Sequence, residues 1–157
     1  MRGEIMGTVI REICGNRIIQ TGAAAWVISQ VLKTLIHLIV NKKIVWERLV
    51  GDGGMPSSHS ATVTSVAVAT GFTAGWGSPV FGVAVFMAII VMHDARGVRR
   101  ETGKQAVVIN DMIELFEKMG AGNLTPEQTL KEFVGHSPMQ VFAGGILGIV
   151  VALVMHM

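Results

Sequence analysis

The stretch SATVTSVAVATGFTAGWGSPVFGVAVFMAIIVM, residues 60–92, carries no charged side chain over 33 positions. A helix needs about 20 mainly apolar residues to cross a hydrocarbon core of about 30 Å, so this stretch is too long for one such helix. Its centre holds Gly75, Gly77 and Pro79, which are residue types that end helices and form turns. The stretch therefore predicts two membrane-spanning helices joined by a tight turn.

Two further apolar segments flank this pair. Residues 18–40 form the first and contain Lys33 and His37, whereas residues 137–155 form the last and contain no charge. Glycine and alanine are frequent in the later segments, and such small residues let helix backbones approach closely. The sequence predicts an all-α integral membrane helical bundle of about four transmembrane helices, forming a single domain over residues 1–157.

The composition agrees with a membrane protein. Half of the 157 residues are apolar, 15% are charged and the mean hydropathy is +0.53, whereas a soluble domain carries about 25% charged residues. Cys14 is alone and cannot form an intramolecular disulfide, so we expect it to fill apolar space. Glu4, Arg11 and Glu12 interrupt the apolar core that a signal peptide needs, so we expect no cleavage. We expect membrane lipids as partners and no nucleic acid.

Two less apolar segments connect the predicted spans. Residues 104–118 place their large apolar side chains near one helical face and their charges toward the other. This pattern predicts an amphipathic helix that lies at the membrane interface or over a site. Further on, Thr125 followed by Pro126 predicts the start of a short helix, because threonine caps helices and proline suits their first position.

Four spans place residues 41–58 and 94–136 on one side of the membrane, with both termini on the other. Three basic residues lie near the N-terminus: Arg2, Arg11 and Arg17. Nine lie on the opposite side: Lys42, Lys43, Arg48, Arg96, Arg99, Arg100, Lys104, Lys118 and Lys131. Because basic residues are retained in the cytoplasm, we expect this side to face the cytoplasm from the plasma membrane.

Three polar motifs fall on this predicted cytoplasmic side. Residues 53–60, GGMPSSHS, precede one apolar helix with His59, and residues 135–140, GHSPMQ, precede another with His136. Between them, residues 94–100 combine Asp94 with three arginines: Arg96, Arg99 and Arg100. Hydroxyls and free N–H groups at a helix start donate to phosphate oxygens, and guanidinium groups bind phosphate through paired hydrogen bonds. Two imidazoles beside such donors indicate phosphate chemistry at a membrane surface.

Each feature also has a structural interpretation. Ser57 or Ser58 can simply cap a helix, and residues 94–100 can form a solvated loop that binds anionic lipid head groups. Lys33 can extend its charge to the interface from a helix that ends early. We favour a functional site, because a lysine inside a span is usually functional and two histidines occupy matched positions. His37 shares the face of Lys33, and a histidine without a role is the simpler interpretation there.

Together these residues resemble the divergent branch of the type 2 phosphatidic acid phosphatase superfamily. The resemblance is carried by residues 54–61, by residues 94–106 with Gly103, and by residues 135–148 with Gly144 and Gly148. It extends from about residue 30 to the last span. The superfamily includes lipid phosphate phosphatases and vanadium-dependent haloperoxidases, which share a helical-bundle core, and a haloperoxidase fits this small membrane chain less well.

The resemblance implies a role for each motif residue. His136 would attack phosphorus to form a phosphohistidine, and His59 would protonate the leaving oxygen as general acid. Both roles suit imidazole, which titrates near neutral pH and is a competent nucleophile. Ser57, Ser58 and Lys33 would bind the phosphate. Neither a metal ion nor an organic cofactor is implied.

The chain departs from the superfamily pattern at several positions. Val40 and Thr129-Leu130 stand where the superfamily has arginines and a serine. We expect Arg96, Arg99 and Arg100 to bind phosphate instead, with Arg99 and Arg100 as the preferred pair. Gln140 stands where an aspartate would orient the nucleophilic histidine. A glutamine carbonyl still accepts a hydrogen bond, although it does not stabilise imidazolium as a carboxylate does. Asp94 is an alternative for this orienting role.

The leading prediction is a membrane phosphatase that hydrolyses a lipid phosphomonoester or pyrophosphate. The alternative is a non-catalytic membrane protein, a scaffold or permease, that binds phosphorylated lipid. Gln140 and the displaced arginines keep this alternative open. The small-residue helix faces also suit a homo-oligomer.

Overall fold

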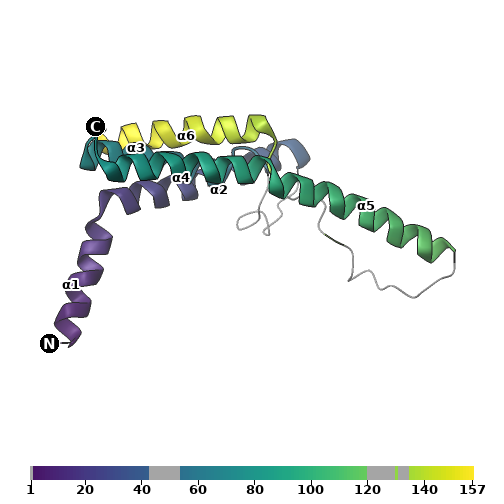
Figure 1. Cartoon of the computed structure of the whole chain (residues 1–157), viewed down its shortest axis with the longest axis horizontal. Coiled ribbons are helices and arrows are strands. Elements are labelled where there is room, and N and C mark those ends of the chain that lie inside the picture. The colour runs from purple at the N-terminus through teal and green to yellow at the C-terminus, as the bar shows by residue number, and fades with distance from the viewer. Residues whose placement is uncertain (1, 43–53, 120–129, 131–134) are drawn as a thin grey trace.

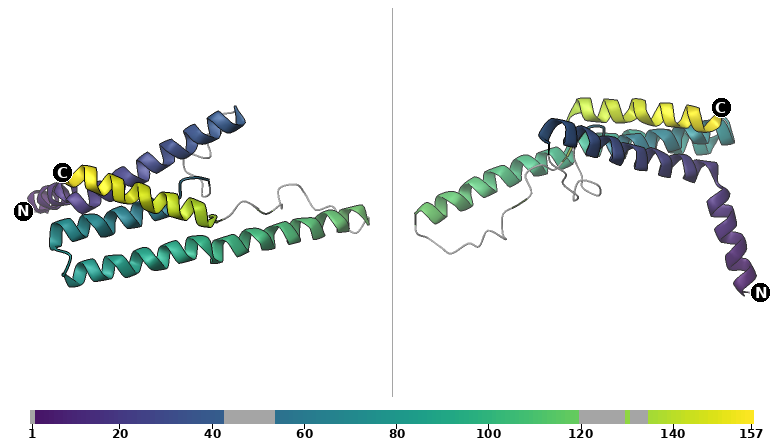
Figure 2. Two further views of the ribbon diagram at one scale, coloured as in Figure 1. Left: turned by 90° about the horizontal axis from the view of Figure 1, so that it is seen from above. Right: turned by 180° about the vertical axis from the view of Figure 1, so that it is seen from behind.

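The computed structural model describes residues 2–42, 54–119, 130 and 135–157, and its regular structure there is entirely helical (Figure 1). The described elements are α1 (Arg2–Gly15), α2 (Arg17–Asn41), α3 (Ser58–Ala74), α4 (Pro79–Arg96), α5 (Val98–Lys118) and α6 (Pro138–His156). Helices α2, α3, α4 and α6 lie side by side in one bundle, whereas α1 and α5 extend away from it (Figures 1 and 2). The short helix predicted at Thr125 lies outside the described residues.

Three parts of the described chain are long and apolar enough to span a membrane. They are α2, the α4–α5 stretch Pro79–Phe116, and α6. Helix α3 has 17 residues and contacts α2, α4 and α6. Several of its hydroxyls donate to carbonyls of their own helix, as Thr62 does to Ser58 and Thr70 to Val66, at 2.8 Å each. The predicted all-α membrane bundle is confirmed, and a fourth span through α3 stays a prediction.

Helices α3 and α6 run in the same direction with their backbones almost in contact. A Cβ atom on Gly144 would lie 2.3 Å from the carbonyl oxygen of Ser57, and one on Gly148 would lie 2.4 Å from that of Ala61. Both distances are shorter than any real contact of a Cβ atom allows. Only glycine therefore fits at these two crossings, which fix the register of α6 on α3.

Helix α2 runs antiparallel to α3 and α6. At one end the Arg17 guanidinium donates to the carbonyl of Met155, the last turn of α6, at 3.1 Å. Further along, a Cβ on Gly22 would meet the Val66 side chain at 2.7 Å. Lys33 lies eleven residues beyond Gly22, or about 16 Å along the helix axis. The direction of α2 thus carries Lys33 toward the end of the bundle where α3 and α6 begin.

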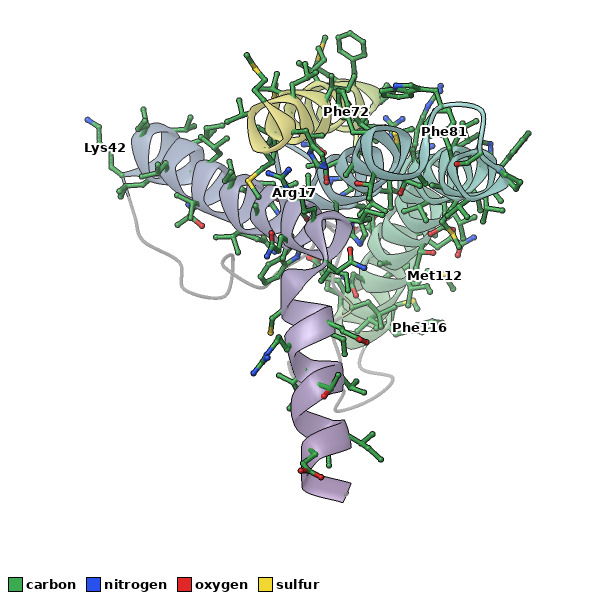
Figure 3. All side chains as sticks on the ribbon, turned by 90° about the vertical axis from the view of Figure 1, so that its left-hand side faces the viewer. Arg17, Lys42, Phe72, Phe81, Met112 and Phe116 are labelled. Carbon is green, nitrogen blue, oxygen red and sulfur yellow. The ribbon has the colours of Figure 1, made fainter. Side chains whose placement is uncertain are left out.

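The turn between α3 and α4 falls where the sequence predicts it. Ser78 caps α4 by accepting from the Phe81 N–H at 3.2 Å, and Pro79 is the first helical residue. The rings of Phe72, Trp76 and Phe81 meet edge to face at this end of the bundle, with centroids 5.1 and 5.2 Å apart. Figure 3 looks along the bundle from this end and labels Phe72 and Phe81. Aromatic rings are typical of a membrane interface.

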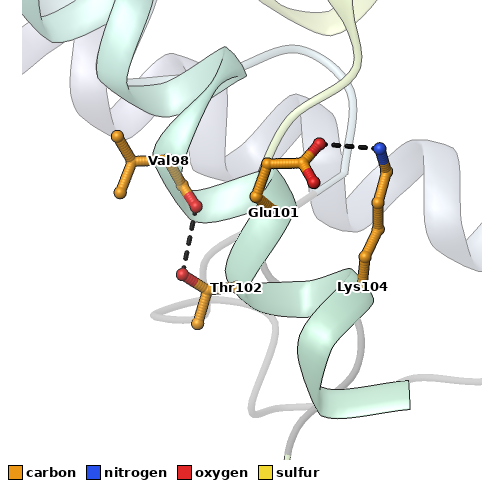
Figure 4. A network of polar contacts seen from close by, with 4 residues as sticks. All are labelled: Val98, Glu101, Thr102 and Lys104. Atoms are coloured by element: carbon orange, nitrogen blue, oxygen red, sulfur yellow. Dashed lines mark hydrogen bonds and ion pairs between the residues drawn. The ribbon is translucent and has the colours of Figure 1, made fainter. Parts of the chain in front are cut away.

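The loop interpretation of residues 94–100 is wrong. Asp94, Ala95 and Arg96 form the last turn of α4, and α5 begins at Val98 after only Gly97. Figure 2 shows α5 continuing the line of α4. Local pairs support the early start of α5, since Thr102 donates to the Val98 carbonyl at 3.0 Å and Lys104 pairs with Glu101 at 2.6 Å (Figure 4). The amphipathic helix predicted from residue 104 therefore starts six residues earlier.

Two asparagine side chains make hydrogen bonds in the parts of the chain outside the bundle. The Asn16 side chain caps α2 by accepting from the Ile18 N–H at 2.9 Å, and helix α1, which the sequence did not predict, ends just before it. On α5, the Asn110 amide donates to the Leu130 carbonyl and accepts from the Leu130 N–H, both at 2.9 Å. This pair ties Leu130 to α5 on the chain's return toward α6.

Replacing Gly144 with alanine should loosen the α3–α6 crossing, because the new methyl group would overlap the Ser57 carbonyl. We expect Gly144→Ala to lower the unfolding free energy by about 1–3 kcal/mol. Thermal unfolding in detergent measures this effect. Gly145→Ala is the matched control, since its Cβ would lie 3.8 Å from Thr64 Oγ1, an ordinary contact. Equal melting temperatures for the two variants would contradict the crossing geometry.

Candidate functional site

The starts of α3 and α6 meet and bring two histidines together. The Ser57 N–H donates to the Gln140 carbonyl at 3.0 Å, which joins the two helix starts through their backbones. Nδ1 of His59 lies 3.3 Å from Nε2 of His136, and the ring planes cross at 66°. His136 is only 1% exposed, whereas His59 is partly exposed. The two imidazoles thus form a pair with one ring open to an incoming molecule.

Local sequence explains how each histidine is held. Ser57 caps α3 and Ser137 caps α6, so that His59 lies in the first turn of one helix and His136 just before the other. Gly135 precedes His136 with φ = 93°, a left-handed conformation that favours glycine. The His136 N–H then donates to the Ala95 carbonyl at the end of α4, at 3.0 Å. Three helix ends therefore fix the position of His136.

The Gln140 side chain determines which nitrogen of His136 carries the proton. Gln140 Oε1 accepts the Ser137 backbone N–H at 3.0 Å and lies 3.3 Å from His136 Nδ1. A backbone N–H is always a donor, so the atom that accepts it is the amide oxygen. This oxygen has a second lone pair and can only accept, and therefore the facing Nδ1 carries a proton. In neutral His136 the lone pair is consequently on Nε2, which faces His59.

Positive charge gathers around the pair. The N-termini of α3 and α6 meet here, and each helix start carries a partial positive charge with free N–H groups. Lys33 is 2% exposed and lies toward the same end of the bundle. Arg96 follows Ala95, whose carbonyl bonds His136, and its side chain is exposed. Such an arrangement of donors and cations favours an anion.

The other predicted residues occupy different surroundings. Ser57 and Ser58 are buried, and Ser57 Oγ accepts both the N–H and the hydroxyl of Ser60, at 3.3 and 3.1 Å. The capping interpretation thus holds for Ser57, whose own hydroxyl hydrogen remains able to donate elsewhere. Asp94 is partly exposed and Arg100 is exposed at the start of α5. The Arg99 side chain lies outside the described part of the chain.

The sequence did not predict an apolar groove beside the histidines. It has a volume of about 370 Å³ and lies between α3, α4 and α6. The residues that line it are Thr64, Met92, Arg96, Pro138, Val141, Phe142, Gly145, Ile146 and Ile149. The signal available in the sequence was Gly145, which has no side chain and lies close to Gly144 and Gly148, the two glycines that pack against α3. Within the described ranges, no three His, Cys, Asp or Glu side chains are grouped to hold a metal ion.

Comparison with known proteins identifies the family. A sequence model of the Divergent PAP2 family matches residues 14–151. The chain belongs to this family. It is 38% identical over 152 residues to the Bacillus subtilis (strain 168) protein named "Uncharacterized membrane protein YuiD", a match that covers 92% of this chain and 96% of that protein. No solved structure matches significantly. The resemblance inferred from the motifs is thereby confirmed for the Divergent PAP2 family.

The tautomer of His136 can be measured directly. In bilayers at neutral pH, we expect solid-state ¹⁵N NMR of labelled histidine to show a protonated Nδ1 and an unprotonated Nε2, assigned by loss of the signal in His136→Ala. Gln140→Glu keeps the acceptor and should retain a protonated Nδ1. Gln140→Met removes the acceptor and should give mixed tautomers. An unprotonated Nδ1 in the unaltered protein would contradict the role of Gln140.

Proposed function

We propose that this member of the Divergent PAP2 family is a membrane phosphatase that hydrolyses a lipid phosphomonoester or pyrophosphate through a phosphohistidine. The observation that carries this proposal is the histidine pair, in which the lone pair of a buried imidazole is directed at a second, more exposed imidazole. A nucleophile and an acid within reach of one phosphoryl group are what such a reaction requires. The family match supports the same chemistry.

In the proposed first step, the phosphoryl group replaces the 3.3 Å contact between Nδ1 of His59 and Nε2 of His136, and the two rings move apart to hold it. Nε2 of His136 attacks phosphorus, the bond from phosphorus to the lipid oxygen breaks, and protonated His59 gives its proton to that oxygen. In the second step, neutral His59 takes a proton from water, which attacks phosphorus and breaks the P–N bond. Inorganic phosphate leaves, and both histidines return to their starting states. Neither step requires a metal ion or an organic cofactor.

The surrounding cations would stabilise charge on the transferring group. Lys33 and the two helix starts are our first choices, because positive groups placed in a dry site act strongly on developing charge. Arg96, which is exposed, would add its charge from the end of α4. Ser57 and Ser58 would donate hydrogen bonds from the same helix start. Arg99 and Arg100 belong to the first turn of α5, and we keep both as proposed phosphate-binding residues, with Asp94 as an orienting carboxylate.

A second function has one observation in its favour. Gln140 occupies the place of an orienting carboxylate, and a neutral amide stabilises the imidazolium of His136 less well than a carboxylate does. A protein that binds phosphorylated lipid as a scaffold or permease, without turning it over, would keep the same anion site. The two functions differ in whether phosphate is released.

Loss of either histidine should abolish the reaction. We expect His136→Ala and His59→Ala to lower phosphate release from lipid phosphates by a factor on the order of 10² or more, as removal of a nucleophile or a general acid does. Release is measured on protein purified in detergent with a panel of phosphatidate, phosphatidylglycerophosphate and polyprenyl pyrophosphate. The best substrate in the panel identifies the lipid class.

His93→Ala is the matched control, because His93 is an exposed histidine in the last turn of α4, on the same side of the bundle. It should release phosphate at the unaltered rate. Equal losses in all three variants would indicate a structural effect and contradict the assignment. Lipid phosphate binding without any release would favour the non-catalytic alternative.

We also propose that the histidine pair faces the cytoplasm. The single cysteine, Cys14, is exposed at the end of α1, near the bundle end opposite the histidines. A membrane-impermeant maleimide added to intact cells should therefore label it. With Cys14→Ser and Lys42→Cys together, the only thiol lies at the end of α2, and labelling should require permeabilised cells. The reverse pattern would contradict this orientation.

A further inference from the structure

The apolar groove between α3, α4 and α6 begins at the end of the bundle that carries the histidine pair. Pro138, which lines one end of the groove, follows His136 by two residues. Arg96 lines the groove directly after Ala95, whose carbonyl accepts the His136 N–H. From Pro138 to Ile149 the groove follows α6 over eleven residues, or about 16 Å. It thus runs from the end of α6 nearest His136 along the surface of the bundle, where Phe142, Ile146 and Ile149 are partly open to the surroundings.

The groove has the chemistry of a hydrocarbon site with one charged end. Its lining is apolar apart from Thr64 and Arg96. The Thr64 hydroxyl donates a hydrogen bond to Met92 Sδ at 3.8 Å, so it is directed at a neighbouring side chain. Arg96 is the charged residue of the lining. Its guanidinium group would complement the negative charge of a phosphate bound beside His136. The volume of about 370 Å³ lies at the low end for ligand pockets.

We propose that this groove binds a single hydrocarbon chain of the phosphorylated lipid, with the phosphate held at the Arg96 end. This inference rests on the proposed function, which supplies the phosphate chemistry. It adds the site that selects the hydrocarbon chain of the lipid. Its small volume accommodates one chain. A second chain of a diacyl lipid would remain in the bilayer.

Gly145 determines how far the groove is open. A Cβ atom there would meet Thr64 Oγ1 at 3.8 Å and would overlap no backbone. In contrast, Cβ atoms on Gly144 and Gly148 would overlap backbone carbonyls of α3. A larger side chain at position 145 would therefore occupy the groove and leave the α3–α6 crossing intact. Gly145 is in this account a specificity residue.

The test compares dodecyl phosphate with phenyl phosphate as substrates of the full chain in detergent. We expect Gly145→Leu to lower kcat/KM for dodecyl phosphate by about tenfold or more, with phenyl phosphate little changed, as is usual when a pocket loses apolar contacts. Gly145→Ala should give a smaller loss in the same direction. Gly82→Leu is the matched control, because a Cβ on Gly82 of α4 meets nothing within 4 Å and Gly82 does not line the groove. It should change neither substrate.

A binding measurement separates this inference from the proposed function. Dodecyl phosphate carrying a diazirine in its chain should cross-link to residues 142–149 of α6 in the unaltered protein and in Gly82→Leu. The cross-links should be lost in Gly145→Leu. This pattern without any phosphate release would support the groove and overturn the phosphatase proposal. Cross-links outside α3, α4 and α6, or cross-links and kcat/KM that Gly145→Leu leaves unchanged, would overturn the groove.

Discussion

The site depends on the close approach of two helix backbones. Because Gly144 has no side chain, the start of α6 lies against the Ser57 carbonyl of α3, and the Ser57 N–H reaches the Gln140 carbonyl at 3.0 Å. This crossing aligns two helix starts that lie eighty residues apart in the chain. Closing such a loop costs conformational entropy, which the packing of the two helices must offset. Both histidines project from these starts. The histidine pair is thus a consequence of how α3 and α6 pack.

A buried charge lies toward the end of the bundle where this crossing is formed. A lysine at the centre of a spanning helix costs about 2.5–3.5 kcal/mol on membrane-insertion scales. Lys33 is nevertheless almost fully buried. Two helix starts add further positive potential at this end of the bundle, and an anion bound there would interact favourably with both. Under the proposed function, a phosphorylated lipid would supply such an anion and place its chain in the apolar groove.

Hydropathy alone predicts most of the bundle. The uncharged run of residues 60–92 and its glycine-rich centre predict α3, α4 and their turn, because burial in lipid restricts the choice of residues. Helix α1 was not predicted, since its segment mixes charges with isolated apolar residues. The helical form of residues 94–100 was also missed, because a cluster of basic residues after an apolar run is typical of a solvated loop as well as of a helix. The Gly97 N–H donates to the His93 carbonyl at 2.8 Å, and α5 begins at the next residue.

For the candidate site, the sequence identifies the motif residues but does not show which of them are in contact. The sequence identified His59, His136 and Gln140, and the structure brings all three into one chain of contacts. The two roles of Gln140 follow only from the three-dimensional geometry. Its backbone carbonyl accepts the Ser57 N–H at the start of α3, whereas its side-chain amide oxygen faces Nδ1 of His136. The groove was equally hidden, because it arises where three helices fail to fill the space beside Gly145.

The most direct test of the account is to trap and locate the phosphorylated residue. The protein would be mixed with its best lipid phosphate, denatured rapidly in alkali, in which phosphohistidine survives, and analysed by mass spectrometry and ³¹P NMR. The account predicts phosphate on Nε2 of His136 and none in His136→Ala. Phosphate on His59 or on Nδ1 of His136, or release of phosphate by His136→Ala, would contradict it.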